Sequence, residues 1–380
     1  MKVLFLTVYD FWNLPNNGSK VISKRNYEML KSIYGDENLY YCGVEEGMEE
    51  YQGKNRLSIS VSKNLFLRYY NYLFKRYRYN KKAEKKILKF IEEVDPQIIF
   101  FDGSLIGNIL KKVRKEQVKA VIVFFHNIET NVALKAVTRN GRLKPYRFIR
   151  YMCNKSNEKF IAQNSNYRIC MNSRDSKLLK KYHKEDVDFY LPTTIIDKYD
   201  EAKYKETIVQ PNTLLFVGSY FSANCHGLNW FITNVLSYIE CKLMIVGSGM
   251  EKYVPPIKNE KIKIYGEVED LGEYYMSSMA VVCPIFLGDG MKTKTAEAMM
   301  YGKTIFATDE ALQGYEVENI RNIYRCNDAK QFINNINTYF MNSDITSCNQ
   351  NIRRCFLEKY EFNFQYRAFN EWMKKWLEKL

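Results

Sequence analysis

The sequence predicts an α/β protein with two domains, each built on a parallel sheet. The chain has 380 residues, which is long for one hydrophobic core and comfortable for two. Short apolar runs alternate with longer segments of mixed polarity, as strands and helices do in this class. Several of the later runs end in glycine, where a tight turn lets the backbone approach a ligand.

The expected strands form two series. The first comprises Lys2–Tyr9, Gln97–Gly103, Ala120–Asn127 and Tyr167–Ser173. The second comprises Thr213–Tyr220, Lys242–Met250, Lys261–Val268, Ala280–Phe286 and Thr304–Thr308. Between them lies the charged segment Asp197–Asn212. We predict an N-terminal domain over 1–200, a C-terminal domain over 201–360, and a C-terminal helix over 361–380 that returns to the first domain.

Composition excludes several classes of protein. Hydrophobic residues make up 46% of the chain, so wholesale disorder is not expected. Nine cysteines without a Cys-x-x-Cys pair suggest free thiols in a reducing cytoplasm. The first residues read as a buried strand rather than a signal peptide, and no apolar run approaches the roughly 20 residues that cross a bilayer. His-x-x-x-His and Cys-x-x-Cys spacings are absent, and we predict no metal site.

The net charge of +14 is unevenly distributed. Between Lys63 and Lys89 there are ten Lys and Arg residues against one acid, Glu84. Five apolar residues recur there at helical spacing: Phe66, Tyr70, Leu73, Phe74 and Tyr77. Either this helical region packs its aromatic face on the core, or Leu65–Lys89 lies on an anionic membrane as a peripheral contact. Charge alone also suggests nucleic acid, but no recognition motif supports it.

The segment Pro284–Gly314 holds the strongest candidate site. A glycine turn is followed by two lysines, which oppose a helix macrodipole unless an anion binds there. If helical, Asp289 and Glu297 would be about 12 Å apart, too far for one acid/base pair but suited to two ends of a long ligand. Asp289 would contact a sugar hydroxyl and Glu297 a ribose. The predicted ligand is a nucleotide diphosphate sugar.

Other candidates stand at predicted strand ends. The turn "NNGSK" precedes a helical pattern and would present backbone N–H groups to an anion. An ordinary turn would explain it too. His126 ends an apolar strand, and His183 is expected on a helix surface. The candidates for catalysis are His126, Asp289, Lys292 and Lys294. Those for substrate binding are Gly18, Ser19, Gly218, Ser219, Gly247, Gly266, Gly288, Gly290, Met291, Thr293 and Glu297.

These patterns together resemble the retaining glycosyltransferases of family 4, the glycosyl transferases group 1. The matching segments are "GDGMKTKTAEAMMYGK", "FVGSY", "MIVGSGM", "YGEVEDLGEYYMSSMAVVCPI", "NNGSK" and "HNIE". The resemblance implies the GT-B fold, with two Rossmann-like domains facing a cleft, and a cytoplasmic, metal-independent enzyme that uses a nucleotide sugar. It further implies that Gly18 approaches the diphosphate, His126 the donor sugar and Glu297 the ribose.

The sequence also departs from the family pattern. Asp289 replaces the usual first Glu, and "GSYFSANCHG" lacks the Arg-plus-Lys pair common after the first strand of the second domain. Lys292 and Lys294 are expected to take over that phosphate role. We expect a UDP-sugar donor, no cofactor, and a saccharide or polyprenyl-linked acceptor in surface polysaccharide biosynthesis. The alternative is a catalytically inactive partner or chaperone of an active glycosyltransferase.

Overall fold

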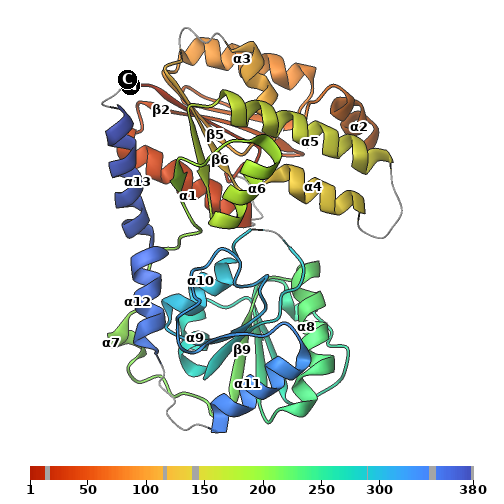
Figure 1. Ribbon diagram of the computed structural model, residues 1–380, viewed down its shortest axis with the longest axis vertical. Coiled ribbons are helices and arrows are strands. Elements are labelled where there is room, and N and C mark those ends of the chain that lie inside the picture. The colour runs from red at the N-terminus through yellow and green to blue at the C-terminus, as the bar shows by residue number, and fades with distance from the viewer. Residues whose placement is uncertain (13–17, 114–117, 139–144, 289, 342–347, 378–380) are drawn as a thin grey trace. The chain divides into compact units, whose positions relative to one another are not determined.

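The computed structural model describes residues 1–12, 18–113, 118–138, 145–288, 290–341 and 348–377 (Figure 1). The chain forms two compact units, one of Met1–Pro192 with Ala368–Leu380 and the other of Thr193–Arg367. Each is an α/β unit with a mostly parallel sheet, and the predicted fold class is confirmed. None of the helices in the described ranges is long and apolar enough to cross a membrane.

The first unit is built on an eight-stranded sheet in the order β3-β4-β2-β1-β5-β6-β7-β8. Its strands are β1 (Val3–Thr7), β2 (Leu39–Glu46), β3 (Tyr51–Gln52), β4 (Arg56–Val61), β5 (Ile98–Asp102), β6 (Ala120–Phe125), β7 (Tyr167–Cys170) and β8 (Phe189–Tyr190). β3 runs antiparallel to β4, whereas the other pairs are parallel. The residues of β1, β5 and β6 are all buried, as expected for strands covered on both faces.

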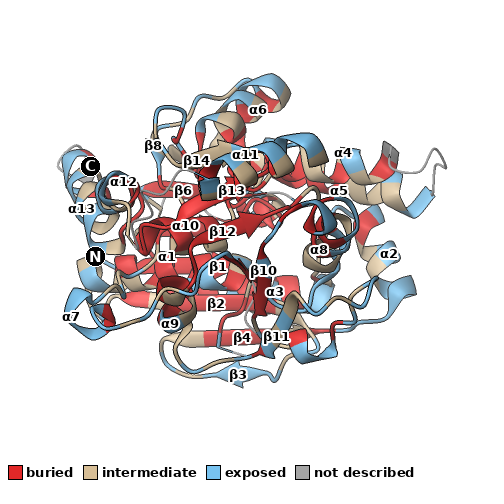
Figure 2. Cartoon of the chain, turned by 90° about the horizontal axis from the view of Figure 1, so that it is seen from below, coloured by how far each residue is buried: buried red, intermediate tan, exposed pale blue. Residues whose placement is uncertain are grey.

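Helices connect these strands. They are α1 (Gly18–Tyr34), α2 (Leu65–Leu73), α3 (Lys81–Val94), the 3-10 helix η1 (Gly107–Lys112), α4 (Glu129–Thr138), α5 (Pro145–Asn164), α6 (Ser173–His183) and the end of α13 (Phe362–Leu377). Figure 2 shows the strands as mostly buried and α2 as largely exposed. The predicted helical region Leu65–Lys89 consists of two helices, α2 and the first part of α3, because the residues from Phe74 to Asn80 are not helical. Tyr77 lies between the two helices and packs into the core at 7% exposure.

The second unit has a six-stranded parallel sheet in the order β11-β10-β9-β12-β13-β14. Its strands are β9 (Thr213–Val217), β10 (Lys242–Val246), β11 (Ile262–Gly266), β12 (Ala280–Cys283), β13 (Thr304–Ala307) and β14 (Ile323–Arg325). Its helices are α7 (Glu201–Tyr204), α8 (Ser222–Asn234), η2 (Leu236–Tyr238), η3 (Met250–Lys252), α9 (Leu271–Ser277), α10 (Thr293–Met300), α11 (Ala329–Met341) and α12 (Gln350–Lys359).

The change of unit comes at Pro192, before the predicted boundary at residue 200. Ion pairs tie Asp197 and the helix α7 that follows it to the second unit. Asp197 pairs with Arg353 at 2.7 Å, and Lys203 pairs with Asp270 at 2.6 Å. The last residues of α13 return to the first unit, where Trp372 stacks on Phe189 with ring centroids 5.0 Å apart.

Candidate functional site

The topology of the second unit places a ligand crevice beside its first strand. From β9 the chain runs outward through β10 and β11, and then returns to β12 on the other side of β9. In an open parallel sheet the loops beyond β9 and β12 therefore diverge, and ligands bind between them at the carboxyl ends of the strands. Gly218 and Ser219 follow β9, and α10 follows β12.

A pocket of about 340 Å³ opens here, within the size range of small-molecule sites. We call it the α10 pocket. Its lining residues are Val217, Gly218, Ser219, Asn224, Val246, Gly247, Ser248, Glu267, Val268, Leu271, Thr293, Lys294 and Glu297. Six of the residues singled out in the sequence thus line one cavity, although they come from three segments of the chain.

Two glycines bring the loops after β9 and β10 together. Gly247 has φ +149°, a conformation that side chains rarely adopt, and a Cβ on it would lie 2.2 Å from the carbonyl oxygen of Gly218. A Cβ on Gly218 would lie 2.8 Å from Nζ of Lys294. Glycine at both positions therefore lets two backbone turns and one lysine share the base of the pocket.

Lys294 is the cation of the α10 pocket. It lies in the first turn of α10, donates to Oδ1 of Asn224 at 2.7 Å, and covers the ring of Phe216 at 4.5 Å from the centroid. Burial lowers the pKa of Lys294 to about 8, against the opposing charges of Cys283 and Glu297. A cation with a neutral amide partner remains available to a bound anion.

Lys292 lies elsewhere, although it is only two residues away. It stands at the N-cap of α10, and its Nζ is 2.8 Å from Oε1 of Glu310 and donates to the carbonyl of Gly290 at 2.8 Å. Its side chain is not among those that line the α10 pocket. The structure therefore places only Lys294 of the predicted pair in that pocket.

Glu297 lies one turn further along α10 than Lys294. Its Oε2 accepts from the hydroxyl of Tyr275 at 3.2 Å. Burial raises the pKa of Glu297, while the bond from Tyr275 and the charges of Lys294 and Lys198 oppose that shift. Tyr275 and Asn224, which hold the two ionic side chains, were missed in the sequence because neither stands in a recognisable motif.

Four other predicted residues do not line the α10 pocket. Gly266 has φ +65°, and a Cβ there would lie 2.9 Å from a carboxylate oxygen of Glu251. Gly288 and Gly290, with φ of +134° and +76°, form the turn before α10. Met291 is buried, and its Sδ accepts from the backbone N–H of Thr193 at 3.5 Å. Asp289 lies outside the described residues.

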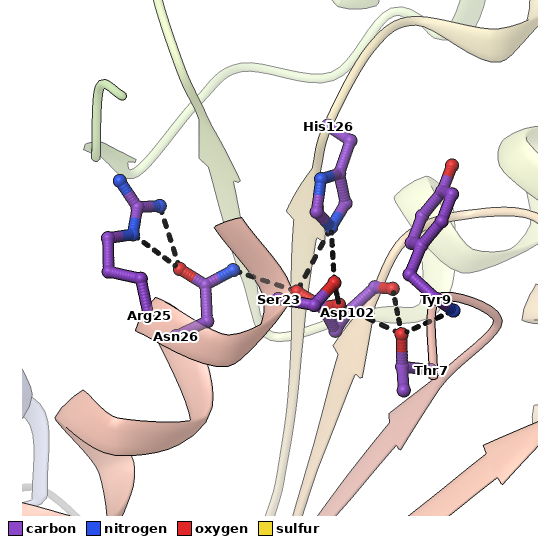
Figure 3. Close-up of polar contacts among 7 residues, drawn as sticks. All are labelled: Thr7, Tyr9, Ser23, Arg25, Asn26, Asp102 and His126. Carbon is purple, nitrogen blue, oxygen red and sulfur yellow. Dashed lines mark hydrogen bonds and ion pairs between the residues drawn. The ribbon is translucent and has the colours of Figure 1, made fainter. Parts of the chain in front are cut away.

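A cluster of buried polar side chains occupies the corresponding place in the first unit (Figure 3). There the chain order reverses between β1 and β5, and Asp102 ends β5. One carboxylate oxygen accepts from Oγ1 of Thr7 at 2.9 Å and from Oγ of Ser23. The other accepts from Nδ2 of Asn26 at 2.7 Å and from Nε2 of His126 at 3.1 Å.

In this Asp102 cluster, the neighbouring side chains favour the ionised form of the Asp102 carboxylate. Burial by itself raises the pKa of Asp102, but His126, Ser23 and Asn26 outweigh that effect and the pKa is lowered. Nε2 of His126 therefore carries the proton that bonds the carboxylate. Nδ1 of the same ring is buried and has no hydrogen-bond partner among the described residues. The imidazole contacts Asp102 and Ser23 through one nitrogen, unlike a Ser-His-Asp triad, which uses both.

The loop after His126 is fixed by a second buried carboxylate, Glu158. It caps α4 by accepting from the backbone N–H groups of Glu129 at 2.7 Å and Thr130 at 2.9 Å. Nε2 of His183 lies 2.9 Å from its Oε2. The prediction that His183 lies on a helix surface is wrong, since its side chain is fully buried against Glu158.

Gly18 and Ser19 begin α1 of the first unit. Gly18 is exposed, and a Cβ there would meet no atom of the described residues within 4 Å. Asn16 and Asn17 of the same predicted turn lie outside the described residues. In the described ranges, no group of three or more His, Cys, Asp or Glu side chains could hold a metal ion.

Comparison with known proteins agrees with the geometry of the second unit. Residues 211–342 match the family model "Glycosyl transferases group 1". This segment is similar to the group 1 glycosyl transferases. It contains the whole α10 pocket and every pocket residue named above. Among curated proteins, a search found no match to the chain.

Solved structures share the fold of the whole chain. Sucrose-phosphate synthase from Thermosynechococcus elongatus has a TM-score of 0.71 at 13% identity, with 100% of each chain covered. Anabaena HepE in complex with UDP has a TM-score of 0.67 at 11% identity, covering 99% of this chain and 100% of that one. The lipopolysaccharide outer core galactosyltransferase WaaB has a TM-score of 0.61 at 13% identity, with 100% of each chain covered. The chain thus shares the fold of these solved structures, and its segment 211–342 is similar to the group 1 glycosyl transferases.

Proposed function

We propose that the chain transfers a sugar from a nucleotide diphosphate sugar to a saccharide or lipid-linked saccharide acceptor, with retention at the anomeric carbon. The donor is a UDP-sugar, and the reaction uses neither a metal nor another cofactor. The enzyme acts in the cytoplasm, in surface polysaccharide biosynthesis. The observation that carries this proposal is the arrangement of Lys294 and Glu297 on one face of α10, inside one pocket.

The spacing of these two side chains fits a nucleoside diphosphate. They are three residues apart on a helix, a rise of about 4.5 Å. The cation lies in the first turn, where the helix N-terminus also attracts anions, and the carboxylate lies one turn deeper. We assign the diphosphate to Lys294, the backbone after β9 and the start of α10. The ribose hydroxyls donate to Glu297.

The same groups supply the chemistry that departure of the nucleotide requires. Charge develops on the diphosphate as the bond to the sugar breaks, and donors already in place stabilise it without reorganisation. Lys294 is such a donor, because Asn224 and Phe216 hold its position. Because a diphosphate is a good leaving group, a strong general acid is not needed at the sugar carbon.

His126 is assigned a hydrogen-bonding role toward a sugar hydroxyl rather than proton transfer. Asp102 accepts from Nε2, which leaves Nδ1 without a partner among the described residues and able to bond a hydroxyl. Retention rests on the resemblance to the group 1 family. The choice of UDP is supported by the neighbour HepE, which was solved in complex with UDP-glucose.

A peripheral membrane contact through Leu65–Lys89 completes the proposal. α2 exposes Phe66 at 86% and Tyr70 at 57%, whereas Tyr72 is buried, so most of its aromatic residues face outward rather than into the core. This observation favours the membrane interpretation over the alternative in which the aromatic face packs on the domain.

Calorimetric titration of UDP, GDP and ADP, followed by product analysis, tests the proposal. We expect UDP to bind with the highest affinity and EDTA to leave binding and transfer unchanged. NMR of the transferred sugar should show the anomeric configuration of the donor. An inverted product would overturn retention. Nucleotide binding without hydrolysis or transfer for any sugar donor would instead favour an inactive partner of another glycosyltransferase.

A further inference from the structure

A second pocket, of about 300 Å³, lies in the first unit between α2 and the start of α3. We call it the α2 pocket. Its charged lining comprises Arg68, Arg76, Arg78, Lys81, Lys82 and the single acid Glu46. Neither the family match, which begins at residue 211, nor the donor chemistry of the second unit assigns it a role.

Only part of this positive charge is neutralised within the chain. Arg68 pairs with Glu46, and Nε of Arg76 pairs with Glu84 at 2.8 Å. Arg78, Lys81 and Lys82 have no ion pair with a carboxylate in the described part of the chain. Three cations thus converge on a cavity large enough for a small anionic group, a combination that suits a doubly charged phosphate.

The α2 pocket is continuous with an exposed apolar surface. Leu67 and Tyr70 line the pocket and also belong to the outward face of α2. That face is made of Leu65, Phe66, Leu67, Tyr69, Tyr70, Leu73 and Phe74, all exposed. α2 packs beside α5, which adds the exposed Tyr146, Phe148 and Met152 (Figure 1). A ligand that is charged at one end and apolar at the other would fit both parts of this surface.

We propose that the α2 pocket binds the phosphate of a membrane phospholipid while α2 lies in the headgroup region with its apolar side chains toward the acyl chains. Aromatic residues beside Lys and Arg are suited to that boundary. This inference rests on the peripheral membrane contact proposed above and adds a defined headgroup site. A diffuse charge attraction would respond to surface charge alone, whereas a pocket distinguishes a phosphomonoester from a phosphodiester.

Vesicle binding tests this distinction. Wild-type protein is sedimented with neutral phosphatidylcholine vesicles, and with vesicles containing phosphatidate or phosphatidylglycerol at matched surface charge. We expect at least tenfold tighter binding to phosphatidate. The variant K81Q/K82Q removes two pocket cations, and K63Q/K75Q removes two exposed lysines of the same segment that do not line the pocket.

Both variants lose general attraction, at about fivefold for each cation. Only K81Q/K82Q should also lose the preference for phosphatidate. Phe66→Ser should reduce the binding that persists at high salt. Equal wild-type affinity for the two anionic lipids, or an equal change of preference in both double variants, would overturn the proposal. So would complete displacement from vesicles by dilute inorganic phosphate, which would make the ligand a soluble anion.

UDP titration of the same variants separates this inference from the proposed enzyme. Unchanged UDP affinity with no phosphatidate preference would remove the headgroup site and leave the glycosyltransferase standing. Phosphatidate preference without nucleotide binding would leave the headgroup site standing and remove the proposed enzyme activity.

Discussion

The two units have the same kind of topological switch point and use it differently. In the second unit the crevice beside β9 is an open pocket in which Lys294 and Glu297 keep charge for a ligand. In the first, the Asp102 carboxylate beside β1 accepts from four donors of its own chain, and Nδ1 of His126 is left without a partner among the described residues. Topology therefore determines where polar groups gather, whereas the hydrogen bonds that they make to one another determine how many remain for a ligand. The predictions below test this difference, beginning with the largest effect.

Asp102→Ala should destabilise the first unit by about 3–5 kcal/mol, because it leaves a buried histidine and three buried donors without their acceptor. Urea unfolding measures this loss. Trp372 and Trp376 report on the first unit by fluorescence, and Trp230 on the second. The exposed carboxylate of Glu49 is the matched control, and Glu49→Ala should change stability by less than about 0.5 kcal/mol.

The lowered pKa of Asp102 predicts how the stability of the first unit depends on pH, and urea unfolding at several pH values checks this. Its folded-state pKa is lowered, so its stabilisation is present above the unfolded pKa of about 3.9 and is lost as the pH falls through the folded value. In Asp102→Ala, the free energy of unfolding should therefore fall less steeply as the pH is lowered into the acid limb of its pH dependence. An unchanged limb would mean that the cluster does not hold an ionised carboxylate.

Glu297→Ala should weaken binding of a nucleoside diphosphate by about 2–3 kcal/mol, the upper range for hydrogen bonds to a charged group, because the carboxylate is assigned both ribose hydroxyls. Calorimetry measures the change. Glu269→Ala, which removes an exposed carboxylate of the same unit outside the pocket, is its control. Equal affinities in wild type and Glu297→Ala would remove the ribose assignment.

Lys294→Gln should weaken the same ligand by about 1.5 kcal/mol, since backbone N–H groups still bind the diphosphate. Lys292→Gln removes an identical charge two residues away in sequence. Because Lys292 pairs with Glu310 outside the pocket, this change should weaken ligand binding clearly less. If Lys292→Gln weakens binding as much as Lys294→Gln, the α10 pocket does not define the phosphate site.

The pKa of Lys294 predicts a pH dependence in this pocket. Burial lowers that pKa to about 8, so the cation is lost as the pH rises through that value. Affinity for the diphosphate should then decline on the alkaline side in wild type but not in Lys294→Gln. A parallel decline in both proteins would place the titrating group elsewhere.

The fold was predictable where strands are buried on both faces, because continuous apolar runs such as those of β1, β5 and β9 have few alternatives. β2 and β4 were not named, since β2 contains Gly43 and two glutamates and β4 alternates in polarity. The exposure of α2 was left undecided, because the same aromatic spacing describes a helix face turned inward or outward.

The candidate site was predictable only as far as residues close in sequence. The run from Gly288 to Glu297 suggested a phosphate-binding helix, and the structure separates its two lysines by giving Lys292 to Glu310. Asp102 was overlooked because it ends an ordinary apolar strand. Its four partners come from β1, α1 and the end of β6, so only the folded chain brings them together.

Hydrogen–deuterium exchange with and without saturating UDP tests most directly whether the second unit's switch point, and not the first's, is the nucleotide site. We predict slowed exchange at Gly218–Ser219, Gly247–Ser248 and Thr293–Glu297, with the amides around Asp102 equally protected in both states. Protection that appears around the Asp102 cluster while these three segments stay unchanged would contradict the assignment.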